Sequence, residues 1–118
     1  MQEEIKQITK EDLSHFIGTE QYTKGFLNVL YTDGIVFLMN NGLSWLVTDI
    51  SSYKVHEKVK NLEFQAWTLT VKKNKGVLTL TDGNENIILK QNYSYTNCPI
   101  ETIKMYLVDN VLMLASEY

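Results

Sequence analysis

The sequence predicts an α+β fold in which N-terminal helices are followed by an antiparallel β-meander of four to five strands. Before residue 61, apolar side chains recur with helical spacing at residues 13–17 and 43–50, and from Phe64 onward they alternate with polar ones. Helices followed by consecutive hairpins are typical of α+β domains. The 118 residues suffice for one core, so we expect residues 1–118 to form a single domain, mainly helical over 10–61 and mainly strand over 62–118.

The N-terminal part predicts one short helix. Residues 1–9 are rich in charge, and we expect them to be frayed. Thr9 and Asp12 have the spacing of a capping box, which predicts a helix over residues 10–16 that Gly18 ends. Residues 19–28 are expected to form a loop, because they show no apolar periodicity and contain Gly25.

Residues 28–42, NVLYTDGIVFLMNNG, allow two structures. Thr32-Asp33-Gly34 suits a three-residue hairpin loop between two strands. Alternatively, Asp33 caps a helix over residues 34–41, and Gly42 ends it in the left-handed conformation. Residues 35–39 are apolar on every side, so periodicity does not choose between helix and strand. We favour the helix, because a cap and a stop stand at its two ends.

The later elements follow from clearer patterns. Leu43, Leu46, Val47 and Ile50 share one helical face, which predicts a helix over residues 43–53. Residues 54–60 continue as a polar helical extension or a loop. Strands are expected at residues 64–71, 77–81, 87–93, 103–107 and 111–115, with Asp109-Asn110 as a two-residue turn. The side chains expected in the core are Phe16, Leu30, Leu46, Ile50, Trp67, Leu69, Leu78, Leu80, Leu89, Met105, Leu107 and Leu112.

Composition restricts the function. The formal net charge is −3, and every cation is a lysine because the chain contains no arginine. Arginine supplies the planar fork for bidentate phosphate and guanine contacts, so sequence-specific nucleic-acid binding is disfavoured. Cys98 is the one cysteine, so no internal disulfide is expected. The N-terminus lacks the basic start and apolar core of a secretory signal, and we expect a cytoplasmic protein of the host cell.

Candidate catalytic residues are sparse. His15, His56 and Cys98 have no metal-ligand spacing, and no metal or other cofactor is expected. One alternative remains open, in which Asp33, Asp49 and Glu63 hold a divalent metal near the lysines of residues 72–75, as in a small metal-dependent nuclease or hydrolase. Against it, Gln65 stands where such a site usually places a lysine. The first expectation is therefore that the protein is not an enzyme.

Aromatic side chains supply the candidate binding residues. Tyrosine and tryptophan are enriched at interface hot spots, and aromatic residues fall in the loop before residue 32. We expect a protein partner to contact Glu20, Tyr22, Phe26 and Tyr31.

Several segments together resemble a known family. These are His15–Glu20, Leu30–Gly34, Ser44–Tyr53, Leu78–Asn84 and Ser116–Tyr118. In this order they resemble a bacterial domain family of unknown function that is found on plasmids, phages and chromosomes. The resemblance covers residues 15–118 and implies that the segment around Trp45 is helical and that the C-terminal half is a meander. It implies no catalytic residues.

A second resemblance concerns the class of protein. Small, acidic, single-domain proteins without a catalytic constellation resemble phage-encoded inhibitors of host defence, especially anti-CRISPR proteins. This resemblance implies a mobile-element protein that blocks an RNA-targeting type VI-B CRISPR nuclease, or its RNA-bound complex, by direct protein contact. Neither a membrane nor sequence-specific nucleic-acid binding is part of this expectation.

Overall fold

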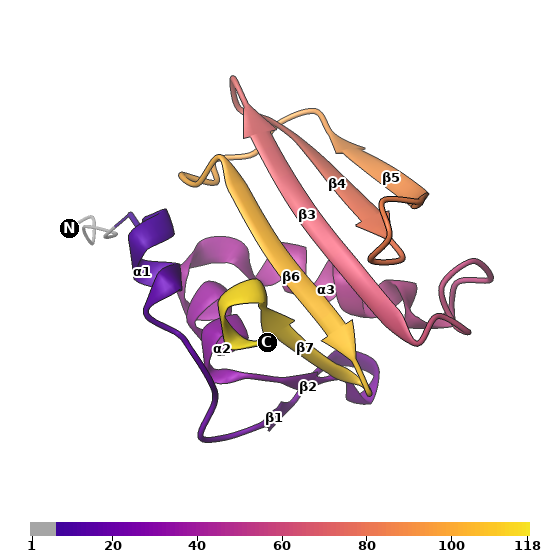
Figure 1. The fold of residues 1–118 in the computed structure, drawn as a ribbon. Helices are drawn as coiled ribbons and strands as arrows, with labels where there is room; N and C mark the ends of the chain where they lie inside the picture. Colours follow the sequence, from indigo (N-terminus) through magenta and orange to yellow (C-terminus); the bar gives the residue numbers. More distant parts are fainter. Residues whose placement is uncertain (1–6) are drawn as a thin grey trace.

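Residues 7–118 are described by a computed structural model, in which helices pack on one face of a seven-stranded sheet (Figure 1). The strands are β1 (Thr23–Lys24), β2 (Leu30–Tyr31), β3 (Phe64–Lys72), β4 (Lys75–Thr81), β5 (Ile87–Tyr93), β6 (Thr102–Val108) and β7 (Val111–Leu114). The helices are α1 (Lys10–Ser14), α2 (Asp33–Leu38) and α3 (Ser44–Ser52), with a wider π turn over Met39–Leu43. The α+β class is therefore confirmed.

The number of strands and their order differ from the prediction. The sheet has seven strands instead of four to five, because two-residue strands β1 and β2 precede the main helices. The order β1-β2-β7-β6-β3-β4-β5 is not a simple meander. After β5 the chain returns to the other side of β3, where β6 pairs antiparallel with it. Alternation specifies which face of a strand is buried but not which strand lies beside it, so the sequence did not reveal this crossing.

The helical alternative for residues 34–41 is confirmed. The helix α2 begins at Asp33, which is its first residue and not its cap. Gly42 has φ +89°, the left-handed conformation predicted for it. The chain does not leave the helical path there, because α3 begins two residues later. Gly42 therefore produces a kink between two consecutive helices.

The N-terminal prediction is confirmed at the capping box. The Asp12 amide donates to Thr9 Oγ1 (3.2 Å), and the Thr9 amide donates to Asp12 Oδ2 (2.9 Å). Residues 1–6 of the segment predicted to be frayed lie outside the described residues. Within residues 7–9, Ile8 is buried, so the chain joins the core before α1 begins.

The side-chain carboxylate of Glu117, close to the C-terminus, caps α2. Glu117 Oε1 accepts hydrogen bonds from the Thr32 hydroxyl (2.6 Å) and the Leu114 amide (2.9 Å), and Oε2 accepts one from the Gly34 amide (3.1 Å). A carboxylate at this position satisfies free amides of the first turn and interacts favourably with the helix dipole. Gly34 permits the approach, since a Cβ there would lie 2.4 Å from Glu117 Oε1.

The core lies between the helices and the sheet. Most core predictions are confirmed, including Trp67, Leu69, Leu78, Leu80 and Met105. Phe16, Leu30, Leu89 and Leu107 are only partly buried. Strand alternation places the complementary side chains of β3–β7 on the opposite face, which none of the helices in residues 7–118 covers (Figure 1). Among residues 7–118 no helix has the length and apolar composition needed to cross a bilayer.

Candidate functional site

The three carboxylates of the nuclease alternative do not form one site. Asp33 begins α2, which packs near β7, and its Oδ2 accepts from the Glu20 amide (2.9 Å). Asp49 lies on α3 and accepts a hydrogen bond from Tyr93 of β5. The strand β5 forms one edge of the sheet and is separated from β7 by three strands. Glu63 is exposed in the turn before β3. Within residues 7–118 no group of three or more His, Cys, Asp or Glu side chains could hold a metal ion.

Asp49 has a structural partner instead. The Tyr93 hydroxyl donates to Asp49 Oδ2 at 2.7 Å. Burial, followed by the hydrogen bond and charge of Asp49, raises the pKa of Tyr93 far above its ordinary value. Tyr93 therefore stays protonated and joins β5 to α3 as a hydrogen-bond donor.

The remaining reactive side chains lie apart from one another. His15 and His56 are exposed, and His56 Nδ1 accepts from the Lys58 amide (3.1 Å). Cys98 is buried, and burial raises the pKa of its thiol. Since the thiolate is the nucleophilic form, Cys98 is held in its unreactive state.

The loop predicted to bind a partner forms a projecting apolar tip. We define the tip as Phe26–Asn28, a tight turn between β1 and β2 in which the backbone of Leu27 is not helical. Phe26 is 49% exposed and Leu27 is 39% exposed. Tyr22, 60% exposed, lies directly before β1, and Glu20 is also exposed. Three of the four predicted binding residues are thus at the surface.

Tyr31 has a different place. Its ring is 2% exposed, and its hydroxyl lies 2.7 Å from Ser51 Oγ on α3. The same hydroxyl accepts a hydrogen bond from the Phe26 amide (3.1 Å). A Cβ on Gly25 would lie 1.9 Å from the Tyr31 ring, so the loop passes directly over this ring. The prediction that Tyr31 contacts a partner does not fit this placement, because its side chain supports the tip from below.

Hydrogen bonds from three other parts of the chain hold the tip. Besides the Tyr31 contact, Lys54 Nζ donates to the Leu27 carbonyl (2.8 Å) and Asn110 Nδ2 donates to the Asn28 carbonyl (2.8 Å). The Gly25 amide donates to the Val29 carbonyl (2.8 Å), which closes the loop at its base. The tip is therefore pre-organised, which lowers the entropy lost when a partner binds.

Leu27 adopts a backbone conformation that leucine rarely takes. Its φ is +53° and its ψ is +32°, in the left-handed region. For a residue with a Cβ this costs roughly 1–2 kcal/mol relative to the right-handed helix. Leu27 and Asn28 both have positive φ, as the two central residues of a tight hairpin turn do, and asparagine suits such a position better than leucine. The leucine at the first of the two positions therefore supports a role for its exposed side chain.

Replacing Leu27 by glycine is expected to leave the melting temperature unchanged or higher, because glycine adopts positive φ without strain. Thermal unfolding followed by circular dichroism measures this. A matched substitution, Leu30→Gly in β2, removes a leucine at an ordinary strand position and is expected to lower the melting temperature. A clear drop for Leu27→Gly would show that the side chain contributes to stability.

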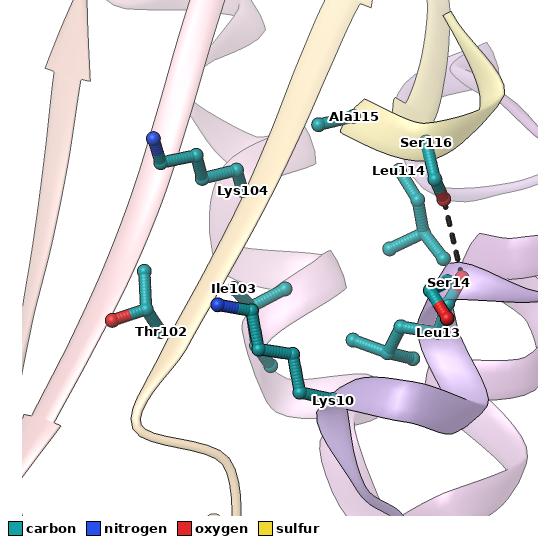
Figure 2. A pocket seen from close by; sticks show the side chains of 9 residues that line it. All are labelled: Lys10, Leu13, Ser14, Thr102, Ile103, Lys104, Leu114, Ala115 and Ser116. Atoms are coloured by element: carbon teal, nitrogen blue, oxygen red, sulfur yellow. Dashed lines mark hydrogen bonds between the residues drawn. The ribbon is translucent and has the colours of Figure 1, made fainter.

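A second surface feature is a pocket beside α1. It encloses about 260 Å³ between α1, the first residues of β6 and the turn after β7 (Figure 2). Leu13, Ile103 and Leu114 form its apolar side. Lys10 extends from α1 toward β6, and Lys104 extends from β6 over the neighbouring strand.

The polar side chains that line the pocket are those of two serines, one threonine and two lysines. Its two serine hydroxyls are engaged, since Ser14 donates to the Glu11 carbonyl (2.6 Å) and Ser116 donates to the Leu13 carbonyl (3.1 Å). Its lining contains no histidine, cysteine or carboxylate to act as a general base. The chemistry of the lining suits a small apolar group next to a negative charge.

Comparison with known proteins identifies the family. Neither the curated proteins nor the solved structures include a significant match to this chain. A model of a family of unknown function, DUF6876, matches residues 7–118. This match agrees with the resemblance to an unknown-function domain, and it assigns no activity. The chain therefore belongs to the family of unknown function DUF6876.

Proposed function

We propose that the protein is a non-catalytic binding protein that occupies a protein partner through the tip Phe26–Asn28. The observation that carries the proposal is the combination found at Leu27, where an exposed apolar side chain sits on strained backbone held by hydrogen bonds from Tyr31, Lys54 and Asn110. The β1–β2 turn requires positive φ at Leu27, but glycine or asparagine would adopt it with less strain, so the choice of an exposed leucine there supports rigid presentation to a partner.

The proposed partner is a host defence effector. The resemblance to phage-encoded inhibitors supports an RNA-targeting type VI-B CRISPR nuclease, blocked stoichiometrically by direct contact. The separation of Asp33, Asp49 and Glu63 gives the nuclease alternative no support, so it is not pursued.

The test is a titration of a purified type VI-B effector, programmed with guide RNA, against the wild-type protein. Inhibition is expected to be complete near one protein per effector. Phe26→Ala, Leu27→Ala and Tyr22→Ala are each expected to weaken binding about fivefold or more, as for anchors that contribute roughly 1 kcal/mol or more. Affinity is measured by calorimetry or biolayer interferometry.

Tyr95→Ala is the matched control, because Tyr95 is an aromatic residue 70% exposed in the connection after β5. It is expected to bind and inhibit like the wild type. Equal losses for Tyr95 and the tip residues would argue against the tip as the anchor. Full inhibition far below one protein per effector would indicate an enzyme instead.

A further inference from the structure

The face of the sheet that the helices leave uncovered has an uneven distribution of charge. We call it the open face, and it consists of the side chains of β3–β7 that point away from the helices. Strand register places four lysines on it, Lys72, Lys75, Lys90 and Lys104. No aspartate or glutamate falls on any strand position of this face, although the chain as a whole carries a net charge of −3.

The lysines surround a floor of hydroxyl groups. Cross-strand pairing aligns Lys90, Thr79, Thr68 and Lys104 in one row across β5, β4, β3 and β6. With neighbouring strands about 4.8 Å apart, the two lysine positions that end the row lie about 14 Å apart. Lys72 and Lys75 form a pair further along β3 and β4. All four lysines are exposed, and none forms an ion pair within the described part of the chain.

At the other end of the same face lies an aromatic cluster. The rings of Phe64, Tyr106 and Tyr118 contact one another with centroid distances of 5.1–5.8 Å. Tyr118 is 72% exposed, so part of this cluster is free to stack against a planar group. The acidic residues of this region are Glu63, Asp82 and Asp109. They lie in the turns beside the cluster and not among the four lysines.

We propose that the open face binds single-stranded nucleic acid without sequence specificity. Phosphate oxygens accept hydrogen bonds, and the lysine row offers ammonium and hydroxyl donors, with no carboxylate at the strand positions of the face. Exposed aromatic rings next to a basic field are the arrangement that holds unpaired bases, because every base has a face that can stack. The strand positions of the face carry no arginine to read base edges, which makes the contact independent of sequence.

Other occupants fit less well. A second copy of the chain meeting this face by two-fold symmetry would bring lysines against lysines. An acidic protein segment would satisfy the lysines but would have no use for the exposed ring of Tyr118. The tip lies elsewhere, against α3 and the β6–β7 turn, so this binding goes beyond the proposed function and does not depend on it.

The test is fluorescence anisotropy of the purified protein with a labelled 12-nucleotide oligouridine RNA and with its oligothymidine counterpart. Binding is expected for both at low salt. The logarithm of affinity should fall with the logarithm of salt concentration with a slope of roughly −2 to −3, as for three or four phosphate contacts of a single strand. A duplex RNA of equal length is expected to bind more weakly, because its bases are not free to stack.

Variants locate the contact. Lys90→Gln combined with Lys104→Gln is expected to weaken RNA binding at least tenfold. The control is Lys58→Gln combined with Lys60→Gln, which makes the same change in charge outside the sheet and is expected to leave RNA binding unchanged. Tyr118→Ala should weaken binding about fivefold or more. Lys90→Arg combined with Lys104→Arg should retain binding, which separates the loss of charge from the loss of folding.

Three outcomes overturn the proposal. They are no RNA binding at low salt, equal losses in the two lysine pairs, and duplex binding as tight as single-strand binding. Polyglutamate is the probe for the acidic-protein alternative, and binding of polyglutamate in preference to RNA would also contradict the proposal. These RNA-binding measurements contain no CRISPR effector. A negative result in them would therefore leave the tip proposal intact, and failure of the tip to bind an effector would leave the RNA-binding proposal intact.

Discussion

Replacing Leu80 by alanine is expected to lower the free energy of unfolding by about 2–5 kcal/mol, the range observed for buried leucines whose removal leaves a cavity. Leu80 is fully buried in β4 and pairs with Trp67 on one side and Leu89 on the other. Its neighbours belong to paired strands, so they have little freedom to close around the lost volume. Urea denaturation followed by tryptophan fluorescence measures the effect.

The matched control for Leu80 is Thr79→Ala. Thr79 is the adjacent residue of the same strand, and its side chain points to the open face. Its replacement is expected to change stability by less than about 1 kcal/mol, within the range of cross-strand side-chain effects. A Leu80 variant as stable as the wild type would show that the faces of β4 have been assigned incorrectly.

Removing the Glu117 carboxylate is expected to cost about 2–4 kcal/mol in Glu117→Ala, because three donors lose an ionised acceptor. These donors are the Thr32 hydroxyl and the amides of Gly34 and Leu114. Glutamine is expected to give a smaller loss, since its carbonyl oxygen replaces one carboxylate oxygen while its NH₂ group meets a donor. Thermal and urea denaturation of both variants measure these changes.

Glu101→Ala provides the comparison for Glu117, since Glu101 is an exposed carboxylate at the start of β6. It is expected to change stability by less than about 0.5 kcal/mol, as surface substitutions usually do. If Glu117→Ala were equally mild, the carboxylate would not be the cap that secures α2.

Local features of the fold were predictable because nearby residues determine them. Thr9 and Asp12 are three residues apart, and their capping box follows from that spacing. Asp109-Asn110 forms the expected two-residue turn, with φ values of +51° and +66°. Gly42 takes the left-handed conformation for which glycine is suited. Each of these depends on a few consecutive residues.

Features that depend on distant residues were not predictable. A two-residue strand such as β2 has no periodicity to detect, and its partner β7 lies about eighty positions away in the pairing of Leu30 with Val111. The role of Glu117 as a cap could not be predicted from the sequence either, because its partners Thr32 and Gly34 precede it by more than eighty residues.

The surface position of part of the tip could be predicted from the sequence. Tyr22 and Phe26 were correctly placed at the surface, but burial of Tyr31 depends on Ser51 and Gly25, which only the folded chain brings together. The lysine field could have been found from the sequence. Lys104 stands between Ile103 and Met105, and Lys90 alternates with Leu89 and Gln91, so strand alternation places both lysines on the outward face. The net charge of the whole chain conceals this separation.

The parallel pairing of β2 with β7 also determines when the growing chain can fold and which fragments of it can fold alone. A nascent chain that ends before Val111 contains the whole sequence of α2 and α3, yet β2 then has no partner strand and α2 has no Glu117. Contacts of such high sequence separation form late and slow the folding of the whole domain. No fragment taken from the first half of the chain should therefore fold independently, and we expect protection from amide exchange in α2 and β7 to appear and disappear together.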